Sequence, residues 1–203
     1  NKEVLNLRAI TGGVDMQARY IDSSKYTLFM MNRDKGHYRV LADPSPTSTV
    51  IYLNQYSKDP AMREILCDAR FRRALSIAID RPELIELIYS GLAEPSNGVS
   101  SEFDPYYLPE FAGRHTEYDP EEAKRLLDQV GLKSGRRGMR RMPDGSAFKQ
   151  ILHYYPAETG TGVELWQLVA EYWREVGLDF VVKSDARTLS VMQVRNGNSD
   201  FWA

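Results

Sequence analysis

The residues that could do chemistry in this sequence are few and scattered. The three histidines, His37, His115 and His153, lie far apart and show none of the short spacings of zinc-binding motifs. A single cysteine, Cys67, excludes an internal disulfide framework and a multi-cysteine zinc site. The sequence also lacks a G-x-S-x-G elbow, a Walker loop and a G-x-G-x-x-G fingerprint. We therefore expect no catalytic residue, no metal site and no cofactor, and a protein that is not an enzyme.

Two clusters of charge are better explained by structure than by chemistry. Glu121 and Glu122 follow Asp119-Pro120 at a helix start, where carboxylates offset the helix dipole. Four arginines flank glycines and the Pro143-Asp144-Gly145 turn, which predicts a solvated hairpin. They are Arg136, Arg137, Arg140 and Arg141. The formal net charge of -2 and the pI near 6.0 also argue against nucleic acid as a partner.

The segment from Tyr154 to Gly160, YYPAETG, is the strongest candidate for contact with a ligand. It follows a predicted strand and leads into a predicted helix, and ligands of open α/β sheets collect beyond the carboxyl ends of the strands. Pockets are commonly lined by aromatic rings with a few polar groups, and Trp202 is a further ring of this kind. The candidate ligand-binding residues are Tyr154, Tyr155, Glu158, Thr159, Thr161 and Trp202.

The elements that must position these residues alternate between helices and isolated strands, which predicts the α/β class. The chain of 203 residues suits one domain. Helices are expected from Ser23 or Ser24 to about Arg33, after Asp68, after Asp80, after Asp119, from Thr161 or Gly162 to Gly177, and over 186–195. Strands are expected at 49–54 (a buried one), just before Pro143, at 148–155 and at 178–182. A loop is expected at 42–46, and a long aromatic-rich connection at 93–118.

Two helical patterns meet at Asp80 with no loop between them. Residues 71 to 79 form one apolar stripe, and a second stripe begins at Leu84. Asp80 can cap the second helix, with Pro82 in its first turn and Glu83 placed as in a capping box. Gly91 is the expected left-handed stop. The sequence thus predicts a corner in which one aspartate satisfies the open amides of the restarted helix.

The two ends of the chain suggest a piece of a longer protein. The sequence begins with Asn1 and has no signal-like apolar segment. It stops on the apolar run Phe201-Trp202-Ala203 without a polar tail. No run of 18 apolar residues is present, so we expect no membrane-spanning helix.

Several motifs, in order, resemble the family 5 extracellular solute-binding proteins, the dipeptide, oligopeptide and nickel-type receptors of ABC importers. The stretch from Arg73-Ala74-Leu75 to Asp80-Arg81 resembles the family's R-x-A-L-x-x-A-I-D-R signature, and the stretch from Tyr118-Asp119-Pro120 to Leu127 its Y-D-P-E-x-A-x-x-L-L helix. Four shorter segments also resemble family elements. They are Gly13-Val14-Asp15, Tyr52-Leu53-Asn54, the strand from Leu178 to Val182 after Gly177, and the end from Gly197 to Trp202.

This resemblance implies one lobe of a two-lobed, type II periplasmic-binding-protein-like fold, with a mixed sheet and flanking helices. Residues 1–203 would form most of the second lobe, and the first lobe would lie outside this chain. The implied function is extracytoplasmic binding of peptides or a similar small solute by closure of the two lobes, with ABC permease subunits as partners. The full-length protein would be periplasmic or extracytoplasmic, and it could be anchored to the membrane as a lipoprotein. Arg195 would face the ligand, whereas the Asp80 corner would be scaffold.

The resemblance leaves the ligand open, because other members of the family take nickel complexes, sugars, opines or haem. Two other functions are compatible with the sequence. One is a two-lobed receptor or chaperone-like module without transport, and the other is a fragment of a hydrolase whose nucleophile lies elsewhere.

Overall fold

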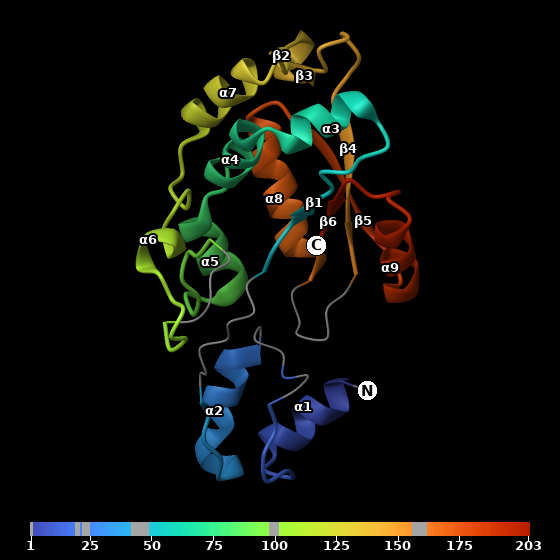
Figure 1. Ribbon diagram of the computed structural model, residues 1–203. Coiled ribbons are helices and arrows are strands. Elements are labelled where there is room, and N and C mark those ends of the chain that lie inside the picture. Colours follow the sequence, from blue (N-terminus) through green and yellow to red (C-terminus); the bar gives the residue numbers. More distant parts are fainter. Residues whose placement is uncertain (1, 19–20, 22–24, 42–48, 98–101, 156–161) are drawn as a thin grey trace.

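The computed structural model of the chain describes residues 2–18, 21, 25–41, 49–97, 102–155 and 162–203 (Figure 1). Its helices are α1 (Lys2–Ile10), α2 (Tyr26–Gly36), α3 (Pro60–Cys67), α4 (Ala69–Ile77), α5 (Arg81–Tyr89), α6 (Pro109–Ala112), α7 (Pro120–Gln129), α8 (Val163–Glu175) and α9 (Arg187–Arg195). Its strands are β1 (Tyr52–Leu53), β2 (Lys133–Ser134), β3 (Arg140–Arg141), β4 (Lys149–Tyr154), β5 (Asp179–Ser184) and β6 (Phe201–Trp202). A short 3-10 turn, Arg136–Gly138, joins β2 to β3.

A four-stranded mixed sheet in the order β1-β6-β4-β5 lies at the centre of the fold. β4 pairs in parallel with both β5 and β6, and β1 pairs with β6 in the antiparallel sense. A parallel pair needs a crossover connection, and α8 supplies it between β4 and β5. The expected α/β class with a mixed sheet and flanking helices is therefore confirmed.

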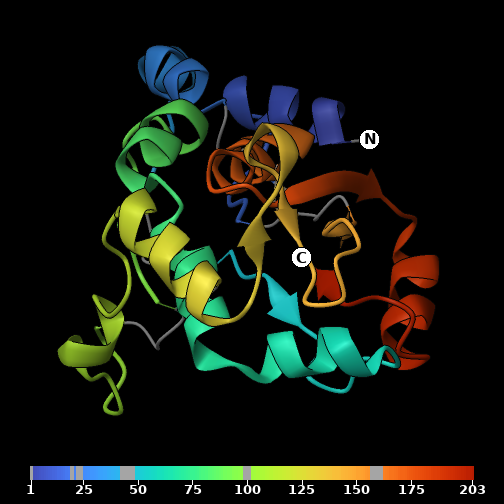
Figure 2. The same ribbon diagram turned by 90° about the horizontal axis from the view of Figure 1, so that it is seen from above.

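The main core lies between one face of this sheet and the helices α4 and α8, and α9 lies beyond the other face (Figures 1 and 2). The phenylalanine ring of Phe180 is its centre. Its ring centroid lies 4.5 Å from that of Trp173 on α8, 4.8 Å from that of Phe201 and 5.7 Å from that of Phe148. The indole N–H of Trp173 donates to the Leu75 carbonyl at 2.9 Å, so the largest buried ring also has its polar atom paired.

The corner at Asp80 forms as the sequence predicts. Asp80 Oδ1 accepts from the Glu83 amide at 3.0 Å, and α5 begins at the next residue, Arg81. The Glu83 carboxylate does not complete a capping box but accepts from the Tyr172 hydroxyl of α8 at 2.7 Å. Burial first, and then this bond, raise the pKa of the Tyr172 hydroxyl. The residue that ends α5 in the left-handed conformation is Ser90 (φ 53°), followed by Gly91 (φ 73°).

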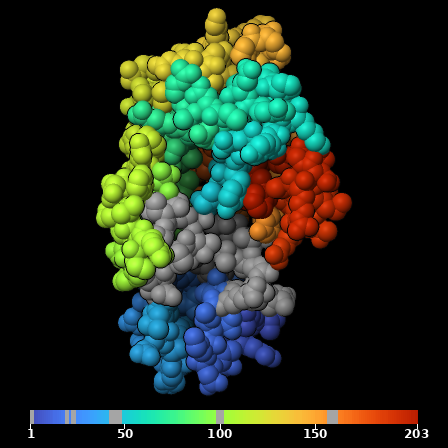
Figure 3. All heavy atoms as spheres, in the orientation of Figure 1, coloured from blue at the N-terminus to red at the C-terminus, as the bar shows by residue number. Residues whose placement is uncertain are grey.

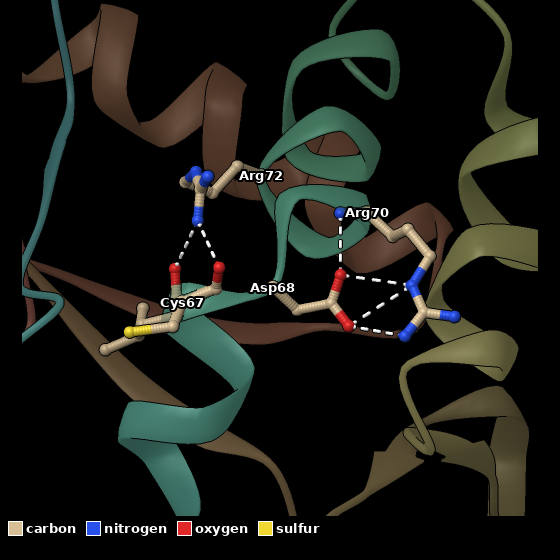
Figure 4. Close-up of polar contacts among 5 residues, drawn as sticks. Cys67, Asp68, Arg70 and Arg72 are labelled. Atoms are coloured by element: carbon tan, nitrogen blue, oxygen red, sulfur yellow. Dashed lines mark hydrogen bonds and ion pairs between the residues drawn. The ribbon is translucent and has the colours of Figure 1, made fainter.

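The arginines near the start of α4, whose charge opposes the helix dipole, are held by local partners (Figure 4). Asp68 caps α4 through the Arg70 amide at 2.8 Å and also pairs with the Arg70 guanidinium at 2.6 Å. Arg72 donates to the Leu66 and Cys67 carbonyls, at 2.9 and 2.8 Å, at the end of α3. The carboxylate of Asp68 and the last carbonyls of α3 therefore offset the unfavourable positions of the two guanidinium groups.

Arg140 departs from the expected solvated hairpin. Its side chain is 4% exposed and donates to the Val176 carbonyl at 2.8 Å, to the Lys124 carbonyl at 2.9 Å and to Leu132. Asp128 Oδ1 lies 2.6 Å from the same guanidinium. One arginine thus joins the ends of α7 and α8, and a basic cluster alone could not reveal it. Gly177 (φ 90°) permits this junction, because an added Cβ would lie 2.5 Å from the Gly138 carbonyl oxygen.

Four further expectations differ from the structure. Helix α3 was not expected, although Asp59-Pro60 caps and starts it. The expected buried strand at 49–54 shrinks to Tyr52–Leu53, and Tyr52 is 57% exposed because it sits at the sheet edge. β6 was not expected as a strand. Helix α2 extends to Gly36 with Lys25 at its N-cap, and the expected caps Ser23 and Ser24, like the expected loop at 42–46, lie outside the described residues.

Substitution of Arg140 should destabilise the chain far more than substitution of its neighbour. Arg140→Leu leaves buried carbonyl oxygens without a donor, which costs about 1–3 kcal/mol for each such group. We expect the free energy of unfolding, measured by urea denaturation, to fall by at least about 2 kcal/mol. Arg141→Leu, at an exposed position of the same strand, is the matched control and should change it by less than about 0.5 kcal/mol. Equal losses in the two variants would contradict the role given to Arg140.

The pair formed by Asp68 and Arg70 predicts a pH dependence. The hydrogen bond from the Arg70 side chain holds the pKa of the Asp68 carboxyl below its usual value, against the opposing effect of burial. A pKa lowered by folding gives stability that is present above the unfolded value of about 4 and is lost as the pH falls through the folded value. In Arg70→Ala, NMR titration should show the Asp68 pKa rising toward its ordinary value, and the acid loss of stability should shrink. Arg125→Ala is the control, since Arg125 pairs with Glu122. An unchanged Asp68 pKa in Arg70→Ala would refute the assignment.

Candidate functional site

A row of aromatic rings crosses three neighbouring strands on the face of the sheet opposite the core. Tyr52 of β1 is the register partner of Trp202 of β6, and their ring centroids are 4.9 Å apart. Trp202 is in turn the partner of His153 of β4. Tyr155 follows β4, and its ring stacks on Trp202 at 6.2 Å with an interplanar angle of 26°. The indole of Trp202 therefore lies in contact with both tyrosine rings.

The pleat of the strands determines which residues can join this row. Side chains that are adjacent along a strand point to opposite faces. Phe201 and Tyr154 accordingly enter the core, where Tyr154 is 6% exposed, while Trp202 and Tyr155 take the other face. The sequence pair Tyr154-Tyr155 is thus divided between the core and the site.

Helix α9 completes the surroundings of Trp202. The indole N–H donates to the hydroxyl of Ser190, a fully buried residue of α9, at 2.8 Å. Beside the ring lies a pocket of about 190 Å³ between the last turn of α9, the end of β1 and the residues before β6, named here the β1–α9 pocket. It is lined by Tyr52, Leu53, Asn54, Val194, Ser199 and Trp202. The space-filling view shows the segment around β1 directly beside the C-terminal segment (Figure 3).

A buried polar pair lies on the same face, next to the aromatic row. His153 Nδ1 is 2.6 Å from Asp185 Oδ2, and both residues are buried. Lys183 Nζ lies 3.7 Å from the other oxygen of Asp185. The Asp185 amide donates to the Tyr154 carbonyl at 2.8 Å. This pair gives two buried polar side chains their partners and ties the end of β5 to the end of β4.

The structure brings together only some of the residues predicted to bind ligand. Tyr155 and Trp202 are in contact, whereas Tyr154 belongs to the core. Arg195 is exposed on the last turn of α9 and does not line the β1–α9 pocket, although its neighbour Val194 does. Glu158, Thr159 and Thr161 lie outside the described residues.

Most residues of the site were not predicted: of the six that line the β1–α9 pocket, only Trp202 was a candidate, and Ser190 beside its ring was not one. Tyr52 was placed in a buried strand, and only its pairing with a strand 150 residues later in the chain brings it to Trp202. Ser190 gave no signal, because a serine in an amphipathic helix is unremarkable in sequence.

The residues of the family signature make contacts within the scaffold. Ala74 and Leu75 are buried in the core, and Arg73 lies 4.0 Å from the Glu122 carboxylate. Arg81 donates to the Ser76 carbonyl and hydroxyl, both at 2.8 Å.

The second motif joins α7 to the same scaffold. Asp119 caps α7 through the Glu122 amide at 2.8 Å, with Pro120 in the first turn. The Asp119 amide donates to the Ile77 carbonyl at 2.8 Å. The ring of Tyr118 lies 6.4 Å from that of Tyr172. The two motifs therefore fasten α4, α5, α7 and α8 to one another.

Two negative findings apply to the described part of the chain. Over residues 2–18, 21, 25–41, 49–97, 102–155 and 162–203, no three His, Cys, Asp or Glu side chains are grouped so as to hold a metal ion. Within the same ranges, no helix has both the length and the apolar character needed to cross a bilayer.

Comparison with solved structures places the fold among solute receptors. The chain superposes over its whole length on an oligopeptide-binding protein OppA, with a TM-score of 0.82 and 34% identity, and spans 33% of that protein. It also superposes over its whole length on the oligopeptide-binding protein AppA from Bacillus subtilis, solved with a nonapeptide, with a TM-score of 0.75 and 17% identity, and spans 38% of it. At that identity, AppA supports the fold alone.

Sequence comparison agrees with the structures. Protein XP55 of Streptomyces lividans is 29% identical over 136 residues, which make up 67% of this chain and 24% of that protein. A putative ABC transporter peptide-binding protein of Brucella ovis is 29% identical over 119 residues, 58% of this chain and 20% of its own length. The chain thus spans about a quarter or less of these relatives.

The family profile described as bacterial extracellular solute-binding proteins, family 5, middle, matches residues 1–203. The match covers the whole chain and agrees with the resemblance found in the Asp80 corner and the Tyr118-Asp119-Pro120 helix. The chain belongs to the family 5 bacterial extracellular solute-binding proteins.

Proposed function

We propose that this chain is part of the solute-binding component of an ABC importer that takes peptides or a similar small solute outside the cytoplasm. Two comparisons support a peptide as the ligand. OppA, which is 34% identical over the whole chain, is an oligopeptide-binding protein, and the Brucella ovis relative is described as a putative peptide-binding protein. Residues 1–203 would supply most of one lobe, and the other lobe would come from the rest of the protein.

The observation that carries this proposal is the aromatic row formed by Tyr52, Trp202 and Tyr155. It lies near the carboxyl ends of the parallel strands β4 and β6, where ligands of α/β sheets collect. Aromatic rings give a ligand large contact area at low entropic cost, because they have few rotatable bonds. A ligand held against this row by a second lobe would be gripped from both sides.

The proposed mechanism is binding without covalent chemistry. The ligand favours the closed arrangement of two lobes over the open one, and the population shifts accordingly. The closed protein would present the outer surfaces of both lobes to ABC permease subunits. A lipid anchor on the full-length protein would keep it beside the membrane. The net charge of -2 gives no reason to expect nucleic acid as a partner.

The proposal is tested on the intact protein that contains this chain. Mass spectrometry of ligand co-purified with it should detect peptides, and calorimetry should measure their affinity. Trp202→Ala should weaken binding by at least about tenfold, since loss of an aromatic anchor commonly costs 2 kcal/mol or more. Tyr106→Ala, at an exposed tyrosine outside the aromatic row, is the control and should leave the affinity unchanged.

Arg195→Ala tests whether Arg195 contacts the ligand, independently of the role proposed for the aromatic row. It should weaken binding if Arg195 meets a carboxylate of the ligand, as a charge-assisted pair would. An unchanged affinity retires Arg195 and leaves the proposal intact. Equal affinities of the wild type and Trp202→Ala would overturn the proposed binding site, and bound solutes that are never peptides would rule out a peptide as the ligand.

A further inference from the structure

The walls of the β1–α9 pocket carry no charge. Its six lining residues are two aromatic, two aliphatic and two neutral polar ones. Its volume of about 190 Å³ is below the roughly 300–1,000 Å³ of a pocket that encloses a whole drug-sized ligand. The pocket therefore suits one group of a larger ligand.

Most polar groups of these walls already have partners within the protein. Asn54 accepts from the Tyr56 amide at 3.0 Å, and its own amide lies 3.4 Å from Asp200 Oδ1. The Ser199 hydroxyl donates to the Phe201 carbonyl at 3.0 Å, and the Trp202 N–H is used by Ser190. Among the described contacts of the lining side chains, this leaves only the Tyr52 hydroxyl without a protein partner. To any group that enters it, the pocket therefore presents mainly the surfaces of aromatic rings and aliphatic side chains, and few free hydrogen-bonding groups.

We propose that the β1–α9 pocket receives one uncharged, apolar side chain, aromatic or aliphatic, of a bound peptide. This inference rests on the proposed function, since it assumes that the protein binds peptides. A charged side chain or a sugar ring would give up hydrogen bonds to water here and find few in return. An apolar side chain gives up none and gains contact with the rings of Tyr52 and Trp202.

A cation held over the indole is the alternative for an aromatic pocket. Such a contact needs an open ring face within about 6 Å of the cation. The indole of Trp202 already contacts Tyr52 at 4.9 Å and Tyr155 at 6.2 Å. The two tyrosine rings take up part of the indole surface, and the rest of the lining contains the aliphatic Leu53 and Val194 and no acidic side chain to pair with a lysine or arginine, which favours the apolar occupant.

Val194 is the residue through which this inference is tested. It lines the pocket from α9 and is 38% exposed, so a polar replacement leaves the core intact. Met192, 54% exposed on the same helix and outside the pocket lining, supplies the matched control. The experiment is calorimetry on the intact protein with alanine-based pentapeptides that carry one Phe, or one Lys, at each position in turn.

In the wild type, Phe at one position should raise the affinity at least about tenfold over Ala, because apolar pockets discriminate by that much for even small changes. Val194→Asp should abolish this gain, because the new carboxylate would have no partner when Phe occupies the pocket. At the same peptide position, Lys should then give a higher affinity than Phe. Val194→Lys, a second variant, should favour Asp there instead. Met192→Asp should behave as the wild type.

Two results would overturn the inference while leaving the proposed function standing. One is a wild type that prefers Lys or shows no side-chain preference at any position. The other is a preference for Phe that survives both Val194 variants. If no pentapeptide binds the wild type, this inference fails, and so does the peptide as the ligand of the proposed function, which then requires another small solute.

Discussion

Because neighbouring side chains of a strand point to opposite faces of a sheet, the dipeptide Phe201-Trp202 serves the core and the site at once. Phe201 meets Phe180 in the core at 4.8 Å, while Trp202 meets Tyr52 and Tyr155 on the other face. A shift of one residue in the register of β6 would exchange the two rings and destroy both arrangements. The burial of Phe201 thus fixes where Trp202 points, and the stability of the core positions the site.

Specific hydrogen bonds fasten the helices around this sheet. Asp80 and Asp119 each hold the start of a helix, and Arg140 holds the ends of two others. The hydroxyl of Tyr172 joins α8 to α5, and the indole of Trp173 joins α8 to α4. Each of these bonds uses a polar atom on a helix that is otherwise packed by apolar contact. They determine how the helices are oriented on the sheet, which apolar contact alone leaves loosely defined.

Local signals in the sequence were sufficient for most helices. An aspartate followed by proline or by an apolar stripe is a signal contained within about ten residues, so α4, α5 and α7 could be predicted with their caps. The same signal at Asp59-Pro60 was present and was overlooked. Long-range pairing could not be predicted, because two-residue strands such as β1 and β6 have too few side chains to show a period. The pairing of Tyr52 with Trp202, and therefore the aromatic row, needed the structure.

The burial of Arg140 shows the same limit for charged residues. Its sequence neighbours Arg136, Arg137 and Arg141 are arginines of equal propensity, and only the position of α7 and α8 distinguishes it. Family resemblance supplied what local patterns could not, namely the association of these segments with the family 5 solute-binding proteins. It did so through motifs that hold the scaffold together, which is why it defined the fold better than the site.

The chemistry of the β1–α9 pocket limits which parts of a bound peptide this region of the protein could contact. Its lining residues carry no charge, and most of their polar groups already have partners within the protein, so this region would give a peptide apolar contact but no charged partner for its termini. A buried charge without a partner is costly. The charged ends of a peptide must then stay in water or meet groups beyond the pocket lining, from other parts of this chain or from the opposing lobe. In such an arrangement this lobe would select one side chain, and the groups that meet the termini would select the length of the peptide.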